Sequence, residues 1–151
     1  MFNPEVGIVP DCILKDTSGT LSIAPQYVKQ LHFDSHGLVP VWSQSQPHGW
    51  LYADRRGRII VTGVPEFDNS ADSFHDGLVR VMHDEKYGFA NRAGILVIPA
   101  VYDGALNFEK GTALVCNQCK TRCEDEHCWF TGGQWQRIDK HGRIVAHAGT
   151  Q

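Results

Sequence analysis

Hydrophobic and polar residues alternate in short runs along this chain, and the clearest example lies between Phe74 and Pro99. Within it, Tyr87, Phe89 and Asn91 follow a period of two, which places both rings on one face of a strand. Turn-forming residues separate these runs, so the stretch predicts two short strands, a tight turn and a third strand. We expect it to be one copy of a small β repeat.

The turn of this repeat is an Asp or Asn followed three positions later by glycine. Four copies occur, at Asp16 to Gly19, Asp54 to Gly57, Asn91 to Gly94 and Asp139 to Gly142. The Asp or Asn side chain caps such a turn, and glycine tolerates the positive φ of its fourth position. Hydrophobic residues follow every copy, as expected for the second strand of a hairpin closed by a type I turn with a bulge.

Two further landmarks accompany the turns. A strand rich in aromatic residues leads into them, at Trp50–Tyr52, Tyr87–Phe89 and Trp135–Arg137, with Cys12–Leu14 as the degenerate first copy. An opening strand lies farther upstream, at Gly37–Val41, Gly77–Val81 and Gly111–Val115. Ala24–Tyr27 corresponds to Ile98–Tyr102 as a linking segment. Because large rings at fixed repeat positions usually stack into a shared core, we expect the repeated Trp, Tyr and Phe residues there.

These landmarks resemble the bacterial WG (also called KWG) repeat, which reads roughly Phe-x-x-Gly-Leu-Ala-x-Val, a Trp-Gly-aromatic strand, an Asp-x-x-Gly turn and an Ile-Pro-x-x-Tyr segment. The third copy is the most similar, with Phe74, Gly77, Leu78, Tyr87, Gly88, Phe89, Asn91, Gly94, Ile98, Pro99 and Tyr102. No copy has the Trp-Gly pair intact, since Tyr87 replaces the tryptophan and Leu51 and Gln136 replace the glycine. The resemblance covers about Cys12 to Val145 and implies a β-rich scaffold without a shared set of catalytic residues.

We therefore predict an all-β fold, in which tandem β-hairpin repeats form a twisted solenoid-like array or a small propeller-like assembly. A chain of 151 residues suits one domain, 1–151, of about four repeats near 12–33, 34–74, 75–108 and 109–145. No apolar run approaches the ~20 residues of a membrane-spanning helix. A formal charge of −3 without clustered Lys and Arg argues against nucleic acid. The first residues lack the features of a secretory signal, so we expect a cytoplasmic protein.

The last repeat contains an insertion. Gly77 to Asn91 is 91 − 77 = 14 positions, whereas Gly111 to Asp139 is 139 − 111 = 28. The extra residues, near 116–130, fall between two hairpin strands and contain Cys116, Cys119, Cys123 and Cys128. Four thiolates in C-x2-C-x3-C-x4-C order can surround a tetrahedral Zn²⁺, so we predict a structural zinc clasp. A pair of disulfides in an oxidising compartment, and unligated or redox-active thiols, remain open alternatives.

Function is predicted mainly from this insertion. Trp129 and Phe130 directly follow the last cysteine and are expected to fold back on the clasp or to contact a partner, because exposed aromatics on ordered loops commonly anchor interfaces. The sequence has no H-x-x-x-H helix, nucleophile elbow, P-loop or dinucleotide fingerprint, and four Cys ligands leave no open position on zinc.

The sequence thus predicts a non-enzymatic, bacterial, protein-binding scaffold, or an immunity-like partner of a toxin or effector. Two alternatives use the cysteine cluster for chemistry. One is a small metal-dependent hydrolase, and the other is a thiol-based redox or metal sensor. The partner itself is not indicated by the sequence.

Overall fold

The computed structural model describes residues 13–44, 46, 48–67, 70–125 and 127–150. In this part of the chain, strands β1 to β16 account for nearly all regular structure, and the helix α1 (Pro25–Val28) has four residues. This confirms the predicted all-β fold of tandem hairpin repeats. Cys12, expected at a buried strand position, lies outside the described residues. None of the described helical structure is long and apolar enough to span a bilayer.

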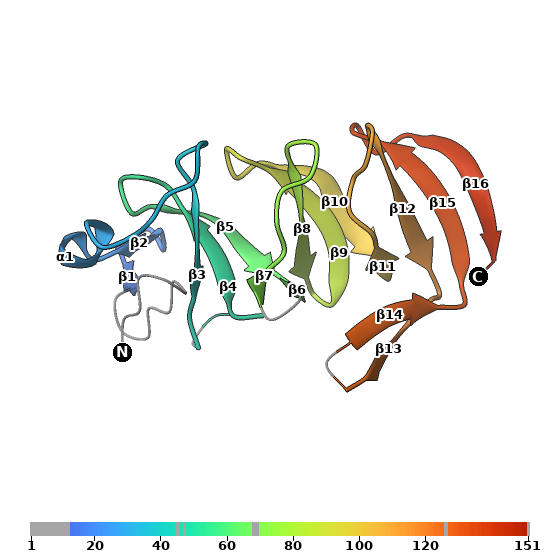
Figure 1. Ribbon diagram of the computed structural model, residues 1–151, viewed down its shortest axis with the longest axis horizontal. Coiled ribbons are helices and arrows are strands. Elements are labelled where there is room, and N and C mark those ends of the chain that lie inside the picture. Colours follow the sequence, from blue (N-terminus) through green and yellow to red (C-terminus); the bar gives the residue numbers. More distant parts are fainter. Residues whose placement is uncertain (1–12, 45, 47, 68–69, 126, 151) are drawn as a thin grey trace. The chain divides into compact units, whose positions relative to one another are not determined.

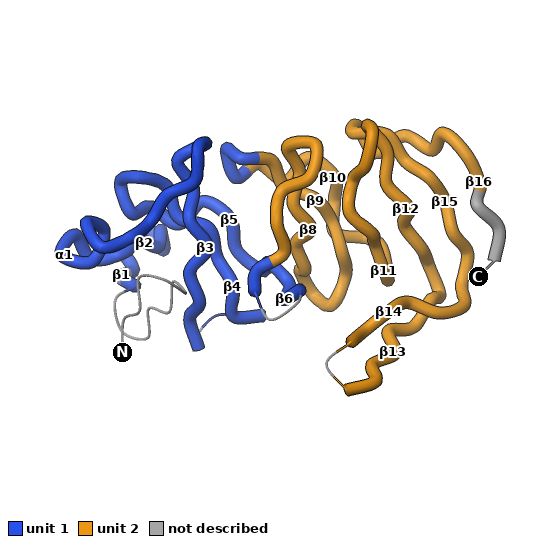
Figure 2. Tube along the Cα trace, viewed as in Figure 1, with its two compact units in different colours: residues 1–71, 92–94 blue, residues 72–91, 95–151 orange. Residues whose placement is uncertain are grey.

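Contacts divide the chain into two compact units, which Figure 2 distinguishes by colour. Compact unit 1 comprises residues 1–71 and 92–94, and compact unit 2 comprises residues 72–91 and 95–151. Each is described by itself below. The expectation of one domain over 1–151 stays a prediction.

Compact unit 1 contains the first hairpin and a three-stranded antiparallel sheet (Figure 1). Strand β1 (Ile13–Lys15) pairs with β2 (Leu21–Ile23), and β3 (Val39–Trp42), β4 (Trp50–Ala53) and β5 (Ile59–Val64) pair in chain order. A short pair, β6 (Glu66–Phe67) with β7 (Ser70–Ala71), follows. The core of compact unit 1 is made of Ile23, Leu31, Val39, Val41, Leu51 and Ala53.

Compact unit 2 contains two larger antiparallel sheets and a separate hairpin (Figure 1). The first sheet is β8 (Leu78–His83), β9 (Lys86–Asn91) and β10 (Leu96–Tyr102). The second has the order β11 (Gly104–Ala105), β12 (Thr112–Asn117), β15 (Gln134–Asp139) and β16 (Ile144–Thr150). Between β12 and β15 the chain forms the hairpin of β13 (Lys120–Glu124) and β14 (His127–Thr131).

The four predicted Asx turns form as expected. In the second copy, Oδ1 of Asp54 accepts hydrogen bonds from the backbone N–H groups of Arg56 (2.9 Å) and Arg58 (3.0 Å). In the fourth copy, Asp139 accepts the equivalent bonds at 2.8 and 3.0 Å. The fourth-position glycines have φ between 81° and 90°, values that strain any residue with a Cβ. Local turn chemistry therefore sets the hairpin positions.

One further turn of the same kind was not predicted. Oδ1 of Asp34 accepts hydrogen bonds from the backbone N–H groups of His36 (2.8 Å) and Leu38 (3.0 Å), and Gly37 has a φ of 78°. At the corresponding places in later repeats, Asp76–Gly77 and Lys110–Gly111 form two-residue turns with positive φ at both positions. The opening glycine is therefore kept while the turn around it changes length.

The buried aromatic residues largely follow the repeat, as predicted. Trp50, Tyr52, Phe89, Phe108 and Trp135 all have exposed fractions of 7% or less. In compact unit 2, Phe89 and Phe108 form an edge-to-face pair with ring centroids 4.7 Å apart. These rings belong to a core that also contains Leu78, Ile98, Ala105, Ala113, Val115 and Ile138. The repeated aromatics are thus structural in the described part of the chain.

The expected match between the linking segments is wrong in structural terms. Residues 25–28 form α1, whereas Ile98–Tyr102 belongs to strand β10. Pro25 lies in the first turn of α1, where a proline has no backbone donor to lose and its fixed φ suits a helix. Pro99 lies where the β9–β10 register shifts between Ile98 and Tyr102, so the strand continues through a bulge. The same Ala/Ile-Pro pattern thus serves two conformations.

Candidate functional site

The Cys-rich insertion forms the β13–β14 hairpin, placed between β12 and β15 as the spacing predicted. In Figure 1 it extends away from the sheet that contains those two strands. It pairs with no other strand among the described residues, and every described residue of β13 is exposed. The chain therefore presents this hairpin to solvent, while its base is attached to a packed corner.

The corner is built around a disulfide between Cys116 and Cys119, whose residues are 1% and 8% exposed. Gly104 allows the β11 backbone to approach it. A Cβ on Gly104 would lie 2.6 Å from Cys116 Sγ, and 2.7 Å from Cδ1 of Phe130. Only a residue without a side chain fits such a contact. The sulfur atoms are therefore part of the packed interior at the base of the hairpin.

Aromatic rings complete the corner. Phe130 packs edge-to-face against Tyr87, with ring centroids 5.5 Å apart, and lies 6.5 Å from the ring of Trp135. The indole N–H of Trp135 donates a hydrogen bond of 2.9 Å to the carbonyl of Gly132, where the chain leaves β14. Burial raises the pKa of the Tyr87 hydroxyl. Phe130 thus folds back on the corner, one of the two roles expected for it.

Asp103 holds the other side of the corner. Its carboxylate forms an ion pair with Lys86 and accepts a hydrogen bond of 2.6 Å from the backbone N–H of Gln118. Gln118 lies between the two cysteines of the corner and has a positive φ of 63°. The hydrogen bond from Lys86 and then that from Gln118 hold the pKa of Asp103 below its ordinary value of 3.8. Asp103 therefore clamps the turn that carries Cys116 and Cys119.

The outer part of the hairpin is cross-linked by a second disulfide, between Cys123 and Cys128. These residues are directly opposite each other in the β13–β14 register, and both are exposed. An isolated two-stranded hairpin is marginally stable in water, so this covalent bond compensates for the missing third strand. The hairpin is thus held at its base by packing and farther out by the disulfide.

Residue alternation gives the hairpin two different faces. Cys123, Cys128 and Phe130 share one face, and Arg122, Glu124, His127 and Trp129 share the other. On the second face, which we call the Trp129 face, the rings of His127 and Trp129 stack with centroids 5.5 Å apart. Trp129 is 38% exposed, and Arg122 is its cross-strand neighbour. The two aromatic residues considered together in the sequence therefore point to opposite sides.

The structure pairs the four cysteines of the proposed zinc clasp as two disulfides, one of the alternatives that the sequence left open. A sulfur atom in a disulfide is not a thiolate and cannot ligate zinc. Among the described residues no group of three or more His, Cys, Asp or Glu side chains could hold a metal ion in this arrangement. Zinc binding by the reduced chain stays a prediction.

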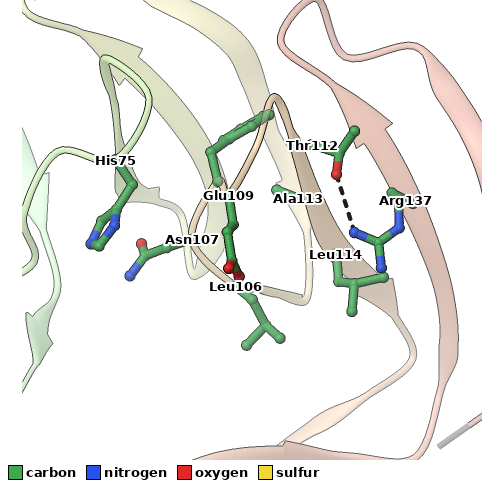
Figure 3. A pocket seen from close by; sticks show the side chains of 9 residues that line it. His75, Leu106, Asn107, Glu109, Thr112, Ala113, Leu114 and Arg137 are labelled. Carbon is green, nitrogen blue, oxygen red and sulfur yellow. Dashed lines mark hydrogen bonds between the residues drawn. The ribbon is translucent and has the colours of Figure 1, made fainter.

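Seven histidines are dispersed over the described part of the chain. All of the following are exposed: His32, His36, His48, His75, His83, His141 and His147. One of them, His75, lines a cavity of about 550 Å³ in compact unit 2, together with Asn107, Glu109 and Arg137 (Figure 3). No pattern in the sequence indicated this cavity, because its lining spans residues 75 to 137. The residues that line the cavity come together only because strands far apart in the sequence pair.

Comparison with known proteins identifies the repeat. The family model of the WG containing repeat matches residues 52–87 and again residues 87–118. Each match runs from the aromatic strand of one repeat toward the next, across a turn of the Asx-x-x-Gly kind. No curated protein and no solved structure matches the chain.

Proposed function

We propose, from the premise that residues 52–118 contain two WG repeats, that the chain is a non-enzymatic protein-binding scaffold. The partner contact is assigned to the Trp129 face of the β13–β14 hairpin. The observation that carries the proposal is the difference in packing between two adjacent aromatic side chains. Phe130 is packed into the base, whereas Trp129 is left 38% exposed on a hairpin with two cross-links.

The chemistry of the Trp129 face supports this role. Tryptophan and arginine are enriched among the residues that contribute most to protein interfaces, and both occur here as cross-strand neighbours, Trp129 and Arg122. Stacking of His127 on Trp129 restricts the indole before a partner arrives, which reduces the entropy lost on binding. The outer edges of β13 and β14 pair with no other described strand, so they add backbone groups to which a partner strand can bind.

The partner is proposed to be another protein, met in the cytoplasm of a bacterium, and an immunity-like complex with a toxin or effector is one form of this proposal. In a reducing compartment the hairpin disulfides would open, and Cys116, Cys119, Cys123 and Cys128 would then form the proposed structural zinc clasp. Either form of the cluster would brace the same hairpin. Partner binding is thus proposed for both.

A photo-crosslinking experiment tests the partner contact. A photoreactive amino acid replaces Glu124, which shares the Trp129 face, and a second variant carries it at Ile144, which is 52% exposed on strand β16. We expect a discrete covalent adduct in native cells from position 124 and none from position 144. Adding Trp129→Ala should remove the adduct, because loss of an interface hot spot weakens binding by roughly 30-fold or more.

The matched control is Ile144→Ala in the protein with the crosslinker at position 124, which should leave the adduct unchanged. An adduct that forms equally from both positions, or that survives Trp129→Ala, would refute the assignment. Circular dichroism of the Trp129→Ala protein checks that the fold is retained. Because Trp129 lies on the outward face of the hairpin, we expect the variant to keep the fold.

A redox sensor is the second candidate function, and one observation favours it. Cys123 and Cys128 are exposed and cross-linked, whereas Cys116 and Cys119 are buried. Thiol–disulfide exchange requires access to a sulfur atom, so the outer bond is the accessible one. A reversible change in partner binding on oxidation, at constant protein fold, would support this function.

A further inference from the structure

The cavity in compact unit 2 carries an inference that is independent of the hairpin. Its floor contains Phe108 and Ala113, both part of the core, and its rim contains Leu106 and Leu114. Leu106 is 41% exposed, so the cavity combines an apolar floor with an apolar rim open to solvent. A volume of about 550 Å³ accommodates a small organic molecule.

Backbone contacts fix the wall of the cavity. The backbone N–H of Leu106 donates to the carbonyl of Leu114 at 2.8 Å, and Glu109 and Thr112 exchange backbone bonds of 2.8 and 3.2 Å. Gly111 lies in the turn that Glu109 and Thr112 close, and its backbone N–H donates a hydrogen bond of 2.8 Å to the carboxylate of Asp76. The segment from Leu106 to Leu114 is therefore a closed, braced loop, and the cavity is formed before any ligand binds.

Charged groups of opposite sign lie along this wall. One guanidinium nitrogen of Arg137, on β15, donates a bond of 3.1 Å to the hydroxyl of Thr112, which orients the cation. Figure 3 shows Arg137 beside Thr112 and Leu114, with Glu109 and Asn107 on the other side. Glu109 supplies a carboxylate and Asn107 an amide. The cavity thus has an anion-binding group at one end and acceptors toward the other.

The amide of Asn107 is incompletely bonded. Its Oδ1 is buried and has no hydrogen-bond partner among the described residues. A buried acceptor left without a donor is unfavourable, and such atoms are rare in folded proteins. The two ends of an amide have nearly the same shape, so a half-turn of the side chain can exchange them without repacking. Because this oxygen has no surface open to the cavity, a ligand that brings an N–H donor would satisfy it once the amide has made that half-turn.

We propose that this cavity binds a small zwitterion of the amino-acid class, either a free α-amino acid with an aliphatic side chain or a dipeptide. Its carboxylate pairs with Arg137, its ammonium group donates to Glu109 and Asn107, and its aliphatic part contacts Leu106 and Leu114. A simple anion would be repelled by Glu109, and a simple cation by Arg137. Only a ligand with both charges satisfies both ends of the cavity.

Four probes test this assignment by NMR titration of the full chain, read at the side-chain N–H groups of Asn107 and Arg137. Leucine and leucyl-leucine carry both charges, leucinamide lacks the carboxylate, and N-acetylleucine lacks the ammonium group. We expect saturable shifts from the first two, with dissociation constants in the millimolar range or below, and at least about tenfold weaker binding of the other two. Whichever of leucine and leucyl-leucine binds more tightly shows whether the ligand is a free amino acid or a dipeptide.

Charge variants sharpen the test. Arg137→Gln should weaken leucine binding at least about tenfold, whereas the matched variant Arg143→Gln, in the exposed turn before β16, should leave it unchanged. Glu109→Gln should weaken leucine but strengthen N-acetylleucine, because it removes the repulsion of the carboxylate. A lack of saturable shifts from all four probes, or equal binding in the Arg137→Gln protein, would overturn the proposal.

Discussion

Arg80 and Asp72 form a buried, two-point ion pair inside compact unit 2. The Nη2 of Arg80 lies 2.9 Å from Oδ1 of Asp72, its Nε donates a bond of 3.2 Å to Oδ2, and the side chains are 9% and 0% exposed. The remaining terminal nitrogen of Arg80 donates a bond of 2.8 Å to the carbonyl of Ala105. This pair therefore joins the segment before β8 to both β8 and β11.

Breaking the pair on one side should strongly destabilise the protein. Asp72→Ala leaves a buried guanidinium without its anion, and we expect a loss of about 3–5 kcal/mol in the free energy of unfolding. Urea denaturation followed by fluorescence measures it. Replacing both residues by apolar ones, Asp72→Leu with Arg80→Met, should cost less than Asp72→Ala alone, because no buried charge is left.

A matched surface pair serves as control. The Nε of Arg58 lies 3.0 Å from Oδ2 of Asp54, but the Arg58 side chain is 59% exposed. Arg58→Gln should change the free energy of unfolding by less than about 1 kcal/mol. Equal losses in the Asp72→Ala and Arg58→Gln proteins would contradict the role given to burial.

The two disulfides should differ in their resistance to reduction. A mild reductant followed by alkylation and mass spectrometry should label Cys123 and Cys128 first, since both are exposed, and Cys116 and Cys119 only under unfolding conditions. Simultaneous labelling of all four would show that the corner is not protected by its packing.

Zinc content decides which form of the cluster exists in cells. Protein purified anaerobically from the cytoplasm should carry about one zinc ion per chain if the proposed clasp forms, measured by elemental analysis. Cys119→Ser should then abolish the zinc, whereas Cys12→Ser should retain it. Protein with no zinc and no free thiol at positions 116, 119, 123 and 128 would exclude the clasp in favour of the disulfides.

Gly104 should be intolerant of a side chain. In Gly104→Ala the new methyl group would lie 2.6 Å from Cys116 Sγ, so we expect a loss of about 1–3 kcal/mol from overpacking. Gly111→Ala is the control, because a Cβ there meets no atom within 4 Å and only the positive φ opposes it. Disturbed packing of the aromatic rings and the disulfide near Gly104 should change the near-ultraviolet circular dichroism spectrum. This change should appear in Gly104→Ala and not in Gly111→Ala.

The clamp made by Asp103 should weaken in acid. Its pKa lies below the ordinary value of 3.8 in the folded protein, so the ionised carboxylate stabilises the fold above that value. As the pH falls below about 4 and through the folded pKa, this contribution is lost. The urea midpoint of Asp103→Asn should therefore fall less between about pH 6 and pH 3 than that of the unaltered protein.

Hydrogen exchange locates the same effect. Protection of the Gln118 amide, which donates to Asp103, should decrease as the pH falls below about 4 in the unaltered protein and be low at every pH in Asp103→Asn. Asp84→Asn, in the exposed β8–β9 turn, is the control for removing one negative charge. A pH dependence of Asp103→Asn that matched the unaltered protein would rule out the clamp.

Local features of the fold were predictable from the sequence. The Asx-x-x-Gly turns place the hairpins, and alternation of hydrophobic residues gives the strands, because both depend on residues within a few positions of one another. The offset of the last repeat also placed the insertion between β12 and β15. The Asp34 turn escaped prediction because its glycine was assigned only to the opening of a strand.

The candidate sites depend on longer-range contacts. Alternation could have separated Trp129 from Phe130, but only the packing of Tyr87 and Gly104 decides which ring is buried. The spacing of four cysteines in thirteen residues led to the prediction of a zinc clasp and left disulfides as an alternative. Their pairing follows from the strand register of β13 and β14 and from the β12–β13 turn.

The sequence by itself thus determined the repeat, its turns and the place of the Cys-rich hairpin, since each rests on short-range backbone preferences. The tertiary structure decided the pairing of sulfur atoms, the Arg80–Asp72 ion pair and the cavity next to Arg137. Each of these needs groups that are far apart in the chain or free to choose among several partners, and only the packed sheets bring one particular set together.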